Sequence, residues 1–114
     1  MADIKIIEGH ARIDLARWSE LVLESYWGHG RTDEINRKAF RNSVCIAALM
    51  EGRQVGFARA ITDQAVFAYM ADVMVEPDAR GMGIGQALIR ALLELPLLAD
   101  VKRWSLRTAD AHSL

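Results

Sequence analysis

Hydrophobic positions recur at helical spacing in the first part of the chain. Apolar side chains at positions 15, 18, 22 and 26 fall near one face, which predicts a helix from Asp14 to about Tyr26. Glycines in the segment Gly28–Gly30 then interrupt the pattern. A second helix is predicted to begin after Thr32, whose hydroxyl suits an N-cap, and to run to about Asn42.

Apolar and β-branched residues without helical spacing dominate the middle of the chain. The runs Val44–Met50, Gln54–Thr62 and Val66–Glu76 each have the length and composition of a strand. The first two flank a short glycine-containing turn, which is typical of a hairpin. Pro77 ends the third run, because proline has no N–H to donate to a ladder. Together they predict an antiparallel meander, preceded by a shorter strand over Ile4–Glu8.

A helix and one more strand complete the pattern. Residues 84, 88, 92 and 95 share an apolar helical face, and Pro96 stops that helix after Leu95. Alternating polarity predicts a last strand over Val101–Thr108, paired in parallel with Val66–Glu76 through a right-handed crossover. The order β-α-α-β-β-β-α-β predicts one mixed α/β domain over residues 1–114, an antiparallel meander followed by a parallel βαβ crossover.

The composition of the 114 residues is that of one globular domain, with 52% hydrophobic and 25% charged residues. The 14 Lys and Arg nearly cancel the 15 Asp and Glu, so the net charge of −1 argues against a nucleic-acid partner bound by phosphate neutralisation. No stretch approaches the roughly 20 apolar residues of a membrane span, and the N-terminus lacks the features of a signal peptide. We therefore expect a cytoplasmic protein with neither a nucleic-acid nor a membrane partner.

The single cysteine, Cys45, lies in an apolar run and has no second cysteine with which to form an internal disulfide. We predict a buried structural thiol rather than a nucleophile, because burial opposes thiol ionisation. The histidines His10, His29 and His112 are scattered, without the spacing of metal ligands. No metal site is expected.

The loop from Arg80 to Gly85 follows the third strand run and opens the last predicted helix. Glycines at 81, 83 and 85 remove side chains from the loop, so a ligand can approach its backbone. The first turn of the helix adds unpaired N–H groups and the positive end of a dipole, and Arg80 adds a cation. These features predict a cradle for a phosphate or pyrophosphate, the alternative being that the glycines only form a tight turn.

Two common phosphate-binding patterns do not fit this loop. A P-loop needs Lys and then Ser or Thr after its last glycine, and neither is present. The dinucleotide fingerprint fails at its last glycine, where Gln86 stands if the pattern starts at Gly81 and Leu88 if it starts at Gly83. A generic nucleotide-binding domain is therefore disfavoured.

The segment from Val75 to Leu88 resembles the acetyl-CoA-binding motif of the GNAT N-acetyltransferase superfamily. That motif is Arg or Gln, two variable residues, Gly, any residue, then Gly or Ala, and Arg80, Gly83 and Gly85 fill it. The order of predicted elements from residue 3 to about 110 also follows the superfamily. The resemblance implies an N-acetyltransferase in which a primary amine, expected on a small molecule, attacks the thioester of the co-substrate acetyl-CoA directly. A peptide N-terminus or a lysine is the alternative acceptor.

The resemblance implies cofactor contacts on both sides of the strand end. Backbone N–H groups of the loop would hold the CoA pyrophosphate. The strand before the loop would pair with the pantetheine arm, and one of its N–H groups would polarise the thioester carbonyl. These cofactor-binding residues are Val73, Met74, Val75, Arg80, Gly81, Met82, Gly83, Ile84 and Gly85.

Asp72 lies beside these residues on the same strand and is the candidate for the base that accepts the amine proton, directly or through water. The alternative is a solvated or salt-bridged strand carboxylate. Tyr69 is three positions earlier, so strand alternation predicts that it points away from Asp72. Four residues in the connection between the first two helices are predicted to border the acceptor site, with simple loop packing as the alternative: Tyr26, Trp27, His29 and Arg31.

The C-terminus departs from the superfamily pattern. Members usually continue into a further helix, which often carries a tyrosine acid, and two more strands, whereas this chain stops at Leu114. The strand Val101–Thr108 would then have an unpaired edge, so we expect a homodimer that covers it. A non-catalytic or truncated acyl-CoA-binding domain is the alternative function.

Overall fold

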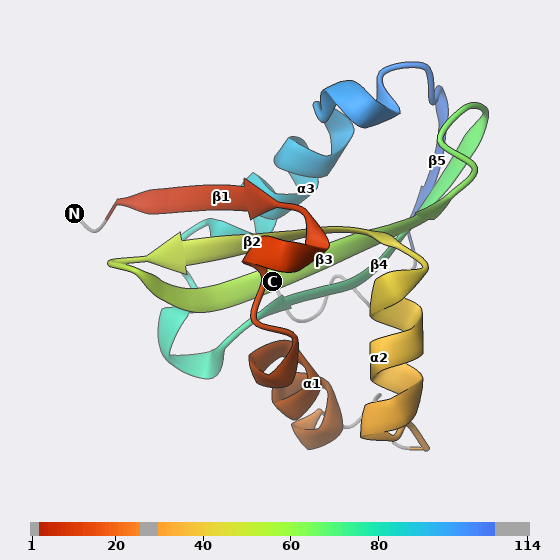
Figure 1. Ribbon diagram of the computed structural model, residues 1–114. Helices are drawn as coiled ribbons and strands as arrows, with labels where there is room; N and C mark the ends of the chain where they lie inside the picture. Colours follow the sequence, from red (N-terminus) through yellow and green to blue (C-terminus); the bar gives the residue numbers. More distant parts are fainter. Residues whose placement is uncertain (1–2, 26–29, 107–114) are drawn as a thin grey trace.

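A five-stranded sheet with the spatial order β1-β2-β3-β4-β5 forms the centre of the computed structural model (Figure 1), which describes residues 3–25 and 30–106. The first four strands pair antiparallel in sequence order, and β5 pairs with β4 in parallel. The predicted meander and parallel crossover are thereby confirmed. The strands are β1 (Ile4–Glu8), β2 (Val44–Met50), β3 (Arg53–Thr62), β4 (Phe67–Val75) and β5 (Arg103–Leu106).

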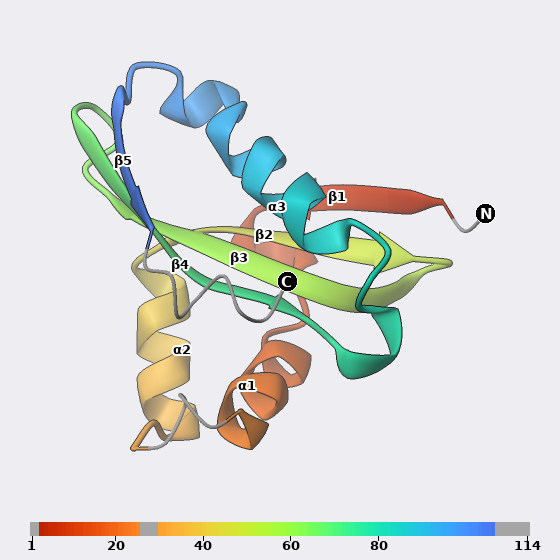
Figure 2. The ribbon, with the colours of Figure 1, turned by 180° about the vertical axis from the view of Figure 1, so that it is seen from behind.

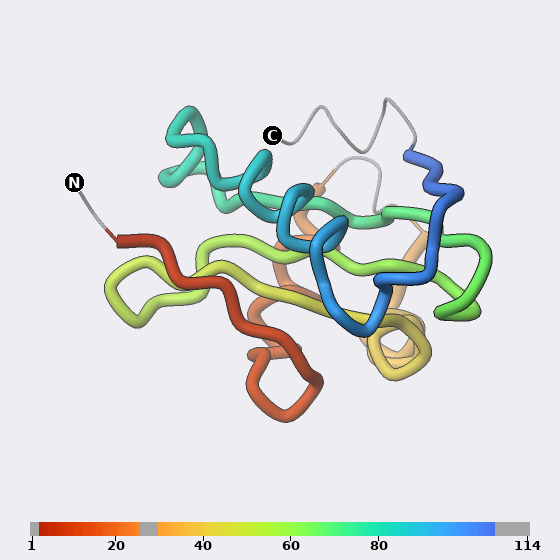
Figure 3. Tube along the Cα trace, turned by 90° about the horizontal axis from the view of Figure 1, so that it is seen from above, coloured from red at the N-terminus to blue at the C-terminus, as the bar shows by residue number. Residues whose placement is uncertain are grey.

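Helices cover both faces of this sheet. In Figures 1 and 2, α1 and α2 lie together on one face and α3 lies on the other; Figure 3, seen from above, shows α3 in front of the strands. No helix in the described residues is long and apolar enough to cross a membrane. The helices are α1 (Leu15–Glu24), α2 (Asp33–Arg41) and α3 (Ile84–Leu93), with short 3₁₀ turns η1 (His10–Arg12), η3 (Pro77–Ala79) and η4 (Pro96–Leu98).

Local sequence signals set the helix boundaries. The Asp14 side chain accepts a hydrogen bond from the backbone N–H of Arg17, and Thr32 accepts one from Ile35, as expected of N-caps. Helix α3 ends at Leu93, two residues earlier than predicted, because Leu95 adopts the extended conformation that a following proline favours.

Two apolar clusters hold the layers together. On the α3 face, side chains of α3 such as Leu88 pack against small residues of the central strands such as Ala58. On the other face, the rings of Trp18 and Phe57 stack with centroids 4.4 Å apart, and Phe40 of α2 lies beside them. Both faces of the central strands are therefore buried, which explains their nearly continuous apolar sequences.

A β-bulge interrupts β4 at Asp72. Arg59 pairs with Ala71 and Phe57 pairs with Met74, so two residues of β4 lie opposite the single residue between them on β3. Asp72 has φ 52°, a left-handed conformation that is uncommon outside glycine.

The bulge reverses the alternation of side chains along β4. Ala68 and Met70 pack on the α3 face before it, and Val73 and Val75 pack on that same face after it. The prediction that Tyr69 and Asp72 lie on opposite faces is therefore wrong, because the bulge adds one residue to the count.

Strand β5 runs beside only the first half of β4. Phe67–Met70 pair with β5, and residues 71–75 of β4 have no strand partner on that side within the described part of the chain. Figure 2 shows β5 in blue at the end of the sheet, next to the β3–β4 hairpin. The two strands thus separate as β4 approaches the glycine-rich loop. The predicted last strand begins two residues later than expected, and its end at Thr108 falls outside the described residues.

Candidate functional site

The glycine-rich loop connects the end of β4 to the first turn of α3. Gly81 and Gly83 have φ values of 83° and 82°, which a residue with a side chain adopts only with strain. Gly83 is the N-cap of α3, and no side chain caps that end. A Cβ added at either glycine would meet nothing within 4 Å. The loop therefore exposes the backbone of a helix N-terminus to open space, which suits an anion.

A different glycine, Gly56 on β3, brings α3 close to the sheet. A Cβ at this position would lie 3.0 Å from Cδ1 of Leu88 and 3.1 Å from the carbonyl oxygen of Met74. The absence of that atom lets the first half of α3 settle against β3 and β4. Sequence analysis missed this residue, because a lone glycine within a strand carries no sign of what approaches it.

Arg80 folds back onto the strand that precedes the loop. Its Nε donates a hydrogen bond to the carbonyl oxygen of Val75 at 3.1 Å. The guanidinium therefore ties the loop to the last residue of β4, in addition to supplying the predicted positive charge.

The N–H groups of β4 near the loop have defined directions. The N–H of Glu76 donates to the carbonyl oxygen of Val55 on β3 at 2.8 Å. Because successive N–H groups of a strand point to opposite sides, those of Val75 and Val73 point away from β3. They face the side on which β5 has separated, so these two residues, rather than Met74, have the orientation predicted for contact with a pantetheine arm.

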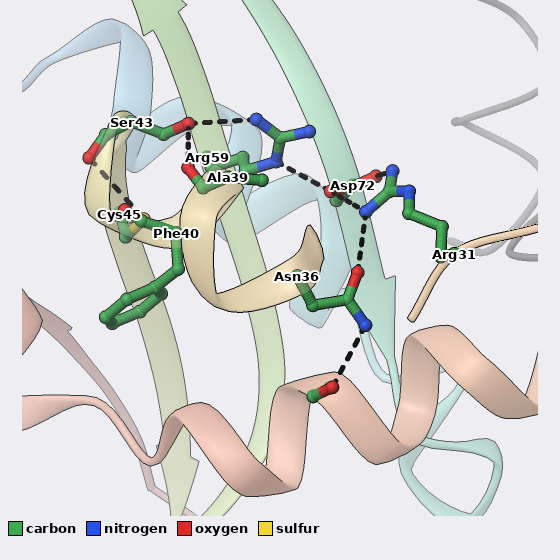
Figure 4. A network of polar contacts seen from close by, with 9 residues as sticks. Arg31, Asn36, Ala39, Phe40, Ser43, Cys45, Arg59 and Asp72 are labelled. Atoms are coloured by element: carbon green, nitrogen blue, oxygen red, sulfur yellow. Dashed lines mark hydrogen bonds and ion pairs between the residues drawn. The ribbon is translucent and has the colours of Figure 1, made fainter. Parts of the chain in front are cut away.

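Asp72 lies in a buried cluster with two arginines, which Figure 4 shows from close by. Nε of Arg59 donates to Oδ2 at 2.6 Å, and Nη2 and Nη1 of Arg31 donate to Oδ1 and Oδ2 at 2.8 Å and 3.2 Å. Asp72 is 2% exposed. Both carboxylate oxygens already accept guanidinium hydrogen bonds. This geometry matches the salt-bridged alternative, while the role of Asp72 as a base stays a prediction.

The hydrogen bonds of the two arginines continue into the neighbouring elements. Nη1 of Arg59 donates to Oγ of Ser43 at 2.9 Å, just before β2. Nη1 of Arg31 donates to Oδ1 of Asn36 at 3.1 Å on α2, and Asn36 donates to Oγ of Ser19 on α1 at 2.9 Å. The polar network in Figure 4 therefore joins the bulge of β4 to β3 and to both helices on that face.

A second buried carboxylate, Glu76, follows β4 directly. Nη2 of Arg17 on α1 donates to it at 2.6 Å, and Nη1 of Arg53 on β3 contacts its other oxygen. The hydrogen bond to Glu76 raises the pKa of Arg17. Sequence analysis did not single out Glu76. The available signal was a second acidic residue four positions after Asp72, at the end of an otherwise apolar strand.

The predicted acceptor-site residues are only partly described. Tyr26, Trp27 and His29 lie outside the described residues. Arg31 is described, and its guanidinium lies against Asp72 on the α1–α2 face of the sheet. The structure thus brings one of the four residues into contact with the candidate base.

A pocket of about 350 Å³ lies elsewhere, where β1 ends and β2 begins. His10, Cys45 and Leu97 are among the lining residues, and none of the predicted cofactor or acceptor residues is. Cys45 is buried, and burial raises the pKa of its thiol to about 12. The prediction that this thiol is buried is confirmed. Within residues 3–25 and 30–106, no group of three or more His, Cys, Asp or Glu is placed to hold a metal ion.

Comparisons with known proteins point to one family. The family model described as "Acetyltransferase (GNAT) family" matches residues 13–113. A solved structure from Xanthomonas campestris, assigned to the GNAT family as an acetyltransferase, is 34% identical with a TM-score of 0.88, and the match covers 98% of this chain and 80% of that one. An aminoglycoside N-acetyltransferase in complex with CoA shares the fold at 18% identity and a TM-score of 0.70, over 95% and 78% of the two chains.

Curated relatives match over shorter segments. The GCN5-related N-acetyltransferase 2 of Arabidopsis thaliana is 39% identical over 56 residues, which are 49% of this chain and 22% of the relative. The serotonin N-acetyltransferase 2 of Oryza sativa is 37% identical over 68 residues, which are 55% of this chain and 34% of that protein. The matched segments thus span about a third or less of these two relatives.

Proposed function

This chain belongs to the GNAT acetyltransferase family, and from that membership we propose that it transfers an acetyl group from acetyl-CoA to a primary amine of a small molecule. The observation that carries the proposal is the loop geometry: Gly81 and Gly83 are left-handed, and added side chains at both would meet open space before the uncapped first turn of α3. Backbone N–H groups there would bind the CoA pyrophosphate.

Two backbone N–H groups of β4 support this proposal, because they could orient the thioester. The N–H groups of Val73 and Val75 point to the side of β4 that lacks a strand partner among the described residues. One of them would donate to the thioester carbonyl and stabilise the charge that develops when the amine attacks. Positioning of the amine beside that carbonyl supplies the rest of the proposed rate enhancement.

The proton acceptor distinguishes two versions of the function. Asp72 is the candidate base, but Arg31 and Arg59 engage both of its oxygens. A carboxylate engaged in this way is less available to accept a proton. This observation supports the second candidate function, an acyl-CoA-binding domain without turnover. We propose a small amine as the acceptor, with a peptide N-terminus or a lysine as the alternative. We also propose that the protein is cytoplasmic and forms a homodimer.

One pair of measurements tests the proposal. Calorimetry with CoA examines binding, and a panel of small amines, peptides and acetyl-CoA, followed by free-thiol release, examines turnover. Binding together with amine-dependent thiol release supports the acetyltransferase. Binding without release by any acceptor supports the non-catalytic domain, and absence of CoA binding by the folded chain would refute both.

A further inference from the structure

Two buried carboxylates stand at the two ends of the segment that the proposed function assigns to the acyl thioester. Asp72 and Glu76 are each 2% exposed, and they flank Val73–Val75. Isolated charges are costly to bury, so such groups are held by partners. Here each carboxylate has two arginine partners within the described residues.

The two arginine pairs have the same construction. In each pair, one arginine comes from β3, the strand next to β4: Arg59 for Asp72 and Arg53 for Glu76. The other comes from the helical layer: Arg31, just before α2, for Asp72, and Arg17, on α1, for Glu76. Each carboxylate therefore connects β4 to its neighbouring strand and to the helices that cover it.

Segment 72–76 needs such support more than the rest of β4. Strand β5 pairs only with residues 67–70, so the backbone of residues 71–75 lacks a ladder on one side within the described chain. The segment also begins at the left-handed Asp72, a conformation that persists in a non-glycine residue only when its surroundings hold it. Three hydrogen bonds from two guanidinium groups provide that hold.

The two ends control different parts of the segment. Asp72 lies in the bulge itself, directly before the N–H of Val73. Glu76 lies where β4 passes into the Pro77–Ala79 turn, which leads to the glycine-rich loop. A change at Asp72 would therefore disturb the thioester end, whereas a change at Glu76 would disturb the pyrophosphate end.

We propose that Asp72 and Glu76 are positioning residues, the first aligning β4 for the acyl thioester and the second aligning the glycine-rich loop for the pyrophosphate. The inference rests on the proposed function. In this arrangement Asp72 acts through the backbone of Val73 and exchanges no proton with the substrate.

The affinity ratio of acetyl-CoA to CoA tests this division, because the two ligands share the pyrophosphate and differ at the acetylated sulfur. The experiment uses calorimetry with both ligands on the full chain and its variants. Asp72→Asn and Arg59→Lys are expected to reduce the ratio by about three- to tenfold, the effect of one weakened hydrogen bond. Glu76→Gln is expected to weaken both ligands by the same factor. Arg37→Gln, which breaks the exposed Arg37–Asp33 pair, is the control and is expected to change neither.

The affinity ratio separates local positioning of the thioester from general effects on the protein. General loosening of the fold, or a change of charge near the anionic cofactor, lowers or raises both affinities together and leaves the ratio unchanged. An unchanged ratio in folded Asp72→Asn or in Arg59→Lys overturns the inference, and Arg59→Lys keeps the test available if Asp72→Asn does not fold. Failure of the unmodified chain to bind either ligand would instead refute the proposed function, and this inference with it.

Discussion

Arg59 and Asp72 form a buried ion pair across β3 and β4, although Arg59 pairs in register with Ala71. Nε of Arg59 reaches Oδ2 of Asp72 at 2.6 Å because the bulge places this carboxylate on the same face of the sheet as Arg59. Without the bulge, Asp72 would point into the apolar layer beneath α3. The ion pair therefore depends on the bulge.

The first prediction concerns the stability that this pair provides. Asp72→Ala is expected to lower the free energy of unfolding by about 3–5 kcal/mol, because it leaves buried Arg59 without its carboxylate. Urea denaturation followed by tryptophan fluorescence measures the change. Arg37→Ala, at an exposed ion pair, serves as the control and is expected to change stability little. Equal small effects of the two substitutions would contradict the prediction.

The second prediction separates a base from a positioning residue at Asp72. For a general base, Asp72→Asn would lower the rate about 10²–10⁴-fold at neutral pH, and the loss would shrink at high pH. For a positioning residue, Arg59→Lys would lower the rate as Asp72→Asn does. In both variants the rate would stay low at high pH. We expect the second pattern, measured as thiol release against pH with any amine that the panel identifies.

The third prediction tests the glycine-rich loop. Gly83→Val is expected to weaken CoA binding at least tenfold, about 1.4 kcal/mol, because it strains a left-handed residue and places a side chain where the ligand approaches. Gly52→Val is a matched control, since Gly52 has φ 80° and equally open surroundings in the β2–β3 turn. Calorimetry compares the two. Unchanged CoA affinity in folded Gly83→Val would refute the cradle.

The fourth prediction concerns the approach of α3 to the sheet. Gly56→Ala places a Cβ about 3 Å from the Leu88 side chain on α3 and from the Met74 carbonyl on β4, so these neighbours must move apart slightly. We expect a loss of about 1–3 kcal/mol in stability, as for other overpacked sites, together with weaker CoA binding, because α3 carries the loop. Thermal denaturation and calorimetry measure both effects. A variant as stable as the unmodified chain would show that α3 adjusts freely.

The fifth prediction follows from the buried thiol. Because the pKa of Cys45 is raised to about 12 by burial, the folded chain is expected to react slowly with iodoacetamide at pH 8, and the urea-unfolded chain rapidly. The unfolded thiol ionises near its ordinary value of 9.0 while the folded thiol keeps its proton. Stability is therefore expected to fall as the pH rises from about 9 towards 12. Rapid labelling of the folded chain would contradict this.

The sequence by itself determined the elements and the loop. Helix α1 begins one residue after the predicted start at Asp14, and α2 begins after the predicted cap Thr32. The meander and crossover follow from strand runs and short turns. The glycines at 81 and 83 indicate a tight, open loop without reference to the rest of the chain. A residue without a side chain can adopt a left-handed φ wherever it stands, and both glycines do so. Such signals are local, so they can be read without knowing what packs where.

The tertiary structure decided the bulge and the arginine pairs. Alternation along β4 predicted the wrong face for Tyr69 relative to Asp72, because a bulge exists only in relation to the partner strand. Arg31 is 41 positions from Asp72 and Arg17 is 59 positions from Glu76, and no local pattern indicates which arginine reaches which carboxylate. The partners are determined by the tertiary packing, which places α1 and α2 on the sheet. A buried carboxylate without a cation is strongly destabilising, so each one pairs with the arginines that this packing brings close to it.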